Sequence, residues 1–154
     1  MSVAGIGPVG RPEAAEAVLD AKRRKNVSWQ RIADEIGRSK VWTTAALLGQ
    51  HPVSQEQARA VARLLGLDDV TAEALRLPPV RGEDSVDPTE PVVARLEEIV
   101  QVYGGAVSEL IREEFGDGIM SAVDFTMDLR RSDTPEGTRV VITLDGKYLP
   151  YREF

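Results

Sequence analysis

The sequence contains no cysteine and only one histidine among its 154 residues. The lack of cysteine excludes disulfides, thiolate metal sites and a cysteine nucleophile, and it is consistent with a cytoplasmic location. His51 alone cannot form a multi-histidine metal site. Because His51 precedes Pro52 in a predicted turn, we interpret it as a surface residue of that turn.

Long apolar runs are also missing, since no stretch approaches the roughly 18 residues that a membrane-spanning helix needs. We therefore expect no membrane association. The net charge of −6 is uneven, because the first 81 residues carry 12 Lys and Arg against 9 Asp and Glu, whereas the remainder carries 7 against 16. A basic N-terminal half keeps nucleic-acid binding open as a function.

The pattern of residues 1–81 predicts a helical bundle. This bundle resembles the helix-turn-helix-like, lambda-repressor-like domain. Apolar periodicity and capping signals predict four helices and a short fifth one. Serine caps are expected at three of them, and glycines are expected to end them. These helices follow Pro12, Ser28, Ser39 and Ser54, and the fifth covers 71–77.

The segment from Trp29 to Ser39 leaves two interpretations of the bundle. A DNA-binding protein would place the following helix in the major groove, with Arg38 and Lys40 as contacts. That helix continues from Val41 to Leu48 with almost wholly apolar or small residues, whereas base recognition needs exposed polar side chains. The composition of this helix therefore argues against DNA binding and favours a bundle used for packing or assembly.

A proline-rich linker at 82–91 separates the bundle from a C-terminal domain at 92–154. Apolar spacing predicts one helix up to Tyr103 and, after an interruption at Gly104, a second helix ending near Phe115. Alternation of period two then predicts a strand over 121–130. A loop at 131–137, a strand over 139–144, a turn at Asp145-Gly146 and a short strand at 147–149 complete the expected order.

The expected fold class is α+β: a helix-turn-helix-like helical bundle followed by a small α+β domain. Two short helices cannot cover one face of the small sheet, so an intertwined dimer is the simplest solution.

Arg95 and Glu98 lie three residues apart and thus on one helix face, where they would form an ordinary surface ion pair. Ser121 follows Gly116-Asp117-Gly118, where a serine would commonly stabilise a turn. Spacing alone gives none of the three a specific chemical role.

Longer segments around these residues resemble the cyanase (cyanate hydratase, cyanate lyase) family. The similar segments are Pro88-Thr89-Glu90-Pro91, Gln101-Val102-Tyr103-Gly104, Phe115 to Ala122 and Val141 to Pro150. The resemblance implies that Arg95, Glu98 and Ser121 are the catalytic residues. It also implies bicarbonate-dependent decomposition of cyanate, with no cofactor and with bicarbonate as co-substrate, in a homodecamer of five dimers. Ala94 and Glu97 depart from the aromatic residues that are usual in the family.

The chemistry implied by the resemblance suits these side chains. Arg95 carries a planar, permanently charged fork for an anion, and Ser121 can donate a hydrogen bond. Glu98 either orients Arg95 or relays a proton. The alternatives are a helix-turn-helix transcriptional regulator with a small-anion-sensing dimerisation domain, and a cyanase-like scaffold that has lost its activity.

Overall fold

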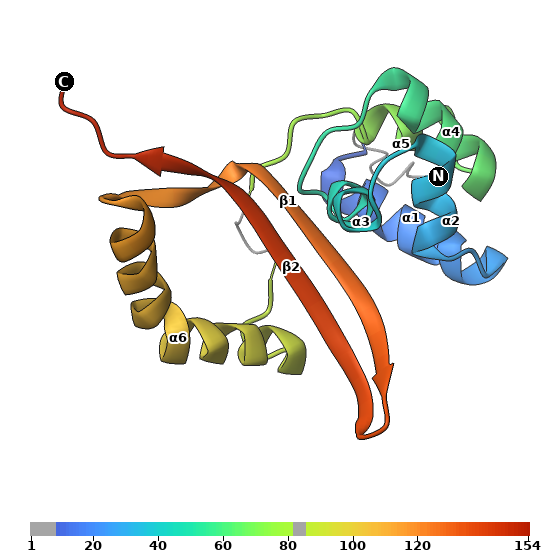
Figure 1. The fold of residues 1–154 in the computed structure, drawn as a ribbon. Helices are drawn as coiled ribbons and strands as arrows, with labels where there is room; N and C mark the ends of the chain where they lie inside the picture. The colour runs from blue at the N-terminus through green and yellow to red at the C-terminus, as the bar shows by residue number, and fades with distance from the viewer. Residues whose placement is uncertain (1–8, 82–85) are drawn as a thin grey trace. The chain divides into compact units, whose positions relative to one another are not determined.

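The computed structural model describes residues 9–81 and 86–154, and it divides into two units, Met1–Arg81 and Gly82–Phe154. Residues 82–85 of the predicted linker lie outside the described residues. None of the described helices is long and apolar enough to cross a membrane. The elements of each unit are coloured by residue number in Figure 1.

The first unit is a bundle of short helices around one apolar core. The helices are α1 (Arg11–Lys25), α2 (Trp29–Ile36), α3 (Lys40–Leu47), α4 (Gln55–Leu65) and α5 (Asp69–Ala74). Its largest fully buried side chains come from all five helices or their ends: Val18, Ile32, Thr43, Leu47, Val61, Leu65 and Leu75. The predicted helical bundle is therefore confirmed.

The predicted caps form as local hydrogen bonds. Ser28 Oγ accepts from Arg31 N at 3.0 Å, and Ser54 forms a reciprocal capping box with Gln57. The predicted start of the fifth helix was wrong by two residues. Asp68 Oδ1 accepts from Thr71 N at 2.7 Å, so this carboxylate caps a helix that begins at Asp69. The same hydrogen bond lowers the pKa of Asp68.

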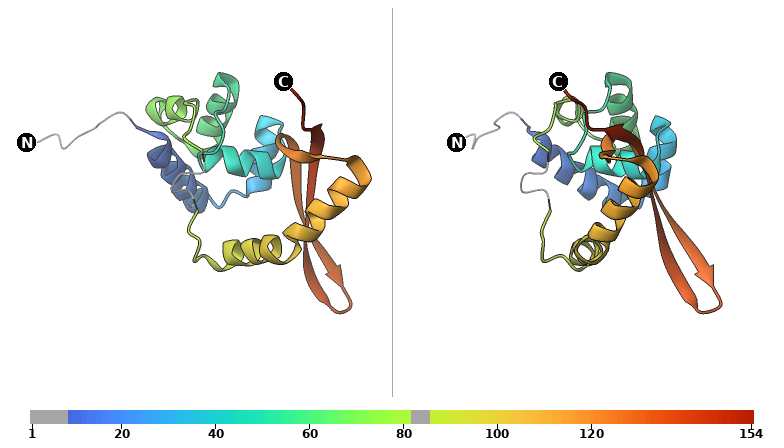
Figure 2. Two further views of the ribbon diagram at one scale, coloured as in Figure 1. Left: turned by 90° about the vertical axis from the view of Figure 1, so that its left-hand side faces the viewer. Right: turned by 60° about the vertical axis from the view of Figure 1, so that its left-hand side comes forward.

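The second unit contains one long helix and one long hairpin: α6 (Pro91–Phe115), β1 (Gly118–Thr134) and β2 (Gly137–Pro150). The strands pair antiparallel and run side by side in both views of Figure 2. The end of α6 meets the base of the hairpin, where the Phe115 and Tyr148 rings stack with centroids 5.3 Å apart. Tyr151 N also donates to Asp117 O at 3.1 Å.

The prediction of two helices in this unit was wrong, because α6 continues through Gly104 and Gly105. Glycine weakens a helix by about 1 kcal/mol relative to alanine but introduces no steric clash, so flanking helix-forming residues can carry the helix through it. The axis of α6 changes direction about midway along the helix in Figure 1. A glycine pair is a common place for such a bend.

The predicted loop at 131–137 and the turn at Asp145-Gly146 were also wrong. β1 continues to Thr134, and the hairpin turn is reduced to Pro135 and Glu136. Asp145 and Gly146 lie inside β2, where they pair with Thr126 and Phe125. The glycine serves close strand packing rather than a turn, so the unit has one hairpin and no separate third strand among the described residues.

Candidate active site

Arg95 and Glu98 lie on the second turn of α6, whose start is fixed by two residues. Pro91 occupies the first helical turn, and Glu90 Oε2 accepts from Val93 N at 2.9 Å. The Arg95 Nη1 atom lies 3.0 Å from Glu98 Oε2. The two side chains are 73% and 57% exposed, so the pair adds little to stability and leaves the guanidinium accessible to an anion.

Ser121 lies in a different environment, because it is only 5% exposed. Its Oγ accepts hydrogen bonds from Val123 N at 3.0 Å and from Asp124 N at 2.9 Å. The strand is irregular here, and Figure 1 shows β1 bending near its N-terminal end. The predicted alternation of side chains therefore breaks at its start: Ser121 is buried while Val123 is 96% exposed.

The described part of a single chain does not join these residues into one closed site. The Arg95 side chain has its ion pair with Glu98, and Ser121 Oγ has its two backbone donors, but among the described residues no hydrogen bond or ion pair connects Arg95 or Glu98 to Ser121. Both Arg95 and Glu98 also face solvent. A site that surrounds a small anion would need further groups.

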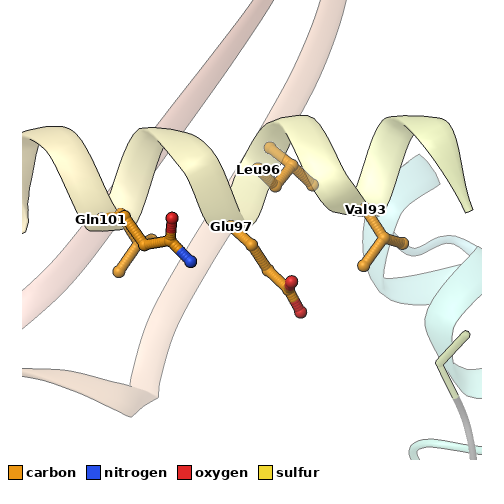
Figure 3. A pocket seen from close by; sticks show the side chains of 5 residues that line it. Val93, Leu96, Glu97 and Gln101 are labelled. Carbon is orange, nitrogen blue, oxygen red and sulfur yellow. The ribbon is translucent and has the colours of Figure 1, made fainter. Parts of the chain in front are cut away.

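A shallow apolar depression of about 360 Å³ lies along α6 near the ion pair. Figure 3 shows four of the lining residues, Val93, Leu96, Glu97 and Gln101, along one stretch of this helix. Arg95 and Glu98 do not line it. Its apolar lining and the carboxylate of Glu97 make it unsuited to an anionic substrate, so we do not assign it as the reaction site.

The described residues contain no cluster of three or more His, Asp and Glu side chains that could hold a metal. The expected absence of a cofactor stays a prediction.

His51 differs from its prediction as a plain surface residue, because it is partly buried and its ring stacks on Trp42 with centroids 5.8 Å apart. Burial, followed by the charges of Arg81 and Arg11, lowers the pKa of His51. Trp42 thus packs within the bundle. Thr43, Ala46 and Leu47 of α3 are buried, so these three side chains are not exposed for base contacts.

The chain is thus an α+β protein with a helix-turn-helix-like bundle. Its second unit carries an exposed arginine–glutamate pair and a buried serine at a strand irregularity. Two family models match the chain: "Cyanate hydratase, N-terminal" over residues 11–79 and "Cyanate lyase C-terminal domain" over residues 85–153. The chain belongs to the cyanate lyase family.

Curated relatives support this membership along nearly the whole length. A cyanate hydratase of Mycobacterium avium (strain 104) is 47% identical over 96% of this chain and 96% of its own. One of Thiobacillus denitrificans (strain ATCC 25259 / T1) is 49% identical over 94% of this chain and 99% of its own. The crystal structure of cyanase from T. urticae gives a TM-score of 0.79 at 34% identity, covering 89% of this chain and 96% of that one. The regulator alternative is not favoured.

Proposed function

We propose that the chain is a cyanate hydratase that decomposes cyanate with bicarbonate as co-substrate. The observation that carries the proposal is the 47–50% identity to cyanate hydratases across both halves of the chain. Bicarbonate adds to the carbon of cyanate and gives a dianionic mixed anhydride. This anhydride loses carbon dioxide and takes up a proton to give carbamate, and carbamate takes up a second proton and separates into ammonia and carbon dioxide.

The residues that we propose for this reaction are Arg95, Glu98 and Ser121. Two anions must be held together, so catalysis depends on positioning and on preorganised positive charge and donors. Arg95 supplies the charge, and its 3.0 Å contact with Glu98 supports an orienting role for the carboxylate. Ser121 supplies a neutral donor. Glu98, or water next to it, is suited to deliver a proton as carbamate forms.

We further propose that the active form is an intertwined dimer assembled into a cytoplasmic homodecamer, with cyanate and bicarbonate as its ligands and no cofactor. The support is the apolar surface of the second unit: α6 has no buried residue in the single chain. Val92, Val100 and Tyr103 are all at least 60% exposed on it. A site with Arg95 as its one arginine has little positive charge for a dianion. A site between subunits would bring several copies of Arg95 together.

The test is ammonia release from cyanate by the purified protein in buffer stripped of carbon dioxide, with and without added bicarbonate. We expect release only when bicarbonate is present. No release by assembled protein would contradict the proposed reaction. Release at the same rate without bicarbonate would contradict the proposed co-substrate.

A further inference from the structure

The irregularity at Ser121 is a large bulge in β1. Met120 pairs with Tyr148 and Phe125 pairs with Gly146, so between these two pairs β1 has four residues and β2 has one, Lys147. The extra residues have no ladder partner, and a bulge of this kind bends a strand and redirects its side chains. The bulge accounts for the burial of Ser121 in a hairpin whose other residues are exposed or half-buried.

The bulge leaves the Ser121 hydroxyl one chemical role. A hydroxyl has two acceptor lone pairs and one proton to donate. The amides of Val123 and Asp124 occupy the lone pairs at 3.0 and 2.9 Å. No acceptor for the remaining proton is found among the described residues of this chain. Ser121 is therefore set up to donate a hydrogen bond to a ligand, and its engaged lone pairs make it a poor nucleophile.

Gly146 allows the second strand to lie against this bulge. A Cβ added to Gly146 would lie 2.5 Å from the Ser121 carbonyl oxygen and would clash with Met120 Cγ. Ordinary contact begins near 3.4 Å, so an alanine would have to displace the Ser121 main chain by about 1 Å. The glycine is needed for this close approach and not for an unusual backbone conformation.

We propose that Gly146 is a positioning residue of the active site. By admitting β2 against the Ser121 carbonyl, it holds the 121–124 bulge in the shape that fixes Ser121 Oγ as a donor toward the substrate anion. This inference rests on the proposed function and extends it to a residue that does not touch substrate. Gly146 acts only through the position of Ser121.

Gly146→Ala tests the proposal in the assembled full-length protein. A misplacement of about 1 Å at a reacting centre can cost about 100-fold in rate. We therefore expect kcat for ammonia release to fall about 10- to 100-fold. The KM for cyanate should change much less, because Arg95 still supplies the attraction for the anion. The elution volume and far-UV circular dichroism should match those of the wild-type protein.

Met120→Ala distinguishes the two groups that the new methyl group would meet, the Met120 side chain and the Ser121 carbonyl oxygen. It removes the clash with the Met120 side chain but leaves the clash with the Ser121 carbonyl. The loss should therefore persist in Gly146→Ala/Met120→Ala, measured against Met120→Ala alone. Recovery in the double variant, or a kcat of Gly146→Ala within twofold of wild type, would overturn the proposal. An inactive wild-type protein in the same assay would instead contradict the proposed function.

A second pair of variants decides the question if Gly146→Ala does not assemble. Val123→Pro removes one of the two donors to Ser121 Oγ, whereas Val123→Ala keeps that donor and changes a side chain that is 96% exposed. We expect kcat of Val123→Pro to be at least tenfold below that of Val123→Ala. Equal kcat values would overturn the assigned role of the bulge.

Discussion

At the scale of single residues, Arg95 combines full charge with wide exposure. Its guanidinium contacts Glu98, and no other ion pair to it is found among the described residues, so its fork of donors suits an oxyanion. A lysine would keep the charge but lose the planar fork that matches a carboxylate-like ligand. The difference between these two cations gives a graded test of what the arginine supplies.

Arg95→Ala should lower kcat/KM for cyanate by about 10²- to 10³-fold, the usual effect of removing one preorganised donor. Arg95→Lys should fall between the alanine variant and wild type. Both variants should assemble normally, since the 73% exposed side chain packs against little in the chain. Ammonia release and size-exclusion chromatography check this, and wild-type rates in Arg95→Ala would refute the assignment.

The residue-scale features that the sequence predicted well are local ones. Ser28, Ser39 and Ser54 cap helices because each hydroxyl bonds to an amide three residues later. The surroundings of Ser121 could not be predicted in this way. They depend on Gly146, 25 residues further on, and on a strand register that alternation does not encode. The catalytic roles of Arg95, Glu98 and Ser121 stay predictions that rest on family resemblance.

At the scale of elements, short-range signals set where each helix of the bundle begins, but not how far the C-terminal elements extend. The sequence predicts an interruption at Gly104 and a loop around Pro135, but α6 continues through Gly104 and β1 continues to Thr134. Gly104 and Gly105 cost helix stability without blocking its hydrogen bonds. β1 continues beyond Arg131 because its residues there pair with Val140 and the neighbouring residues of β2.

Arg11 shows how one side chain fixes three elements of the bundle. It is 9% exposed, and its guanidinium donates to Leu75 O at 2.7 Å, Ala46 O at 2.6 Å and His51 O at 2.8 Å. Ala46 lies in α3, and Leu75 follows α5. The positive guanidinium is also favoured at the C-terminal ends of these helices, where the helix dipole is negative. Burial lowers the pKa of Arg11.

Arg11→Met should destabilise the bundle by about 3 kcal/mol or more, because it removes the charge-assisted hydrogen bonds from the guanidinium to the main-chain oxygens of Leu75, Ala46 and His51. Arg24→Met is the matched control: Arg24 is an exposed residue of α1 paired with Asp20, and its loss should cost about 0.5 kcal/mol or less. Both tryptophans, Trp29 and Trp42, belong to the bundle, so fluorescence-detected denaturation reports on it. Equal midpoints for the two variants would contradict the anchoring role.

At the scale of the whole molecule, the two units differ in how completely they bury apolar surface. The bundle has a closed core, whereas α6 has no buried residue and the hairpin exposes apolar side chains along its length. Exposed apolar area of this extent is typical of an interface. The catalytic residues that we propose lie on the unit with this incomplete burial, so assembly and activity should depend on each other.

Val100→Glu tests this dependence. Val100 is 69% exposed on α6, and a carboxylate placed in an apolar interface would have to be desolvated without a partner. We expect the variant to dissociate and to lose ammonia release together. Val70→Glu is the matched control, because Val70 is 55% exposed on α5 of the bundle, and it should keep both properties. Sedimentation velocity and the ammonia assay give the two readouts. Fully active isolated dimers would show that each site is complete without the larger assembly, and the shared arginines would then have to come from within one dimer.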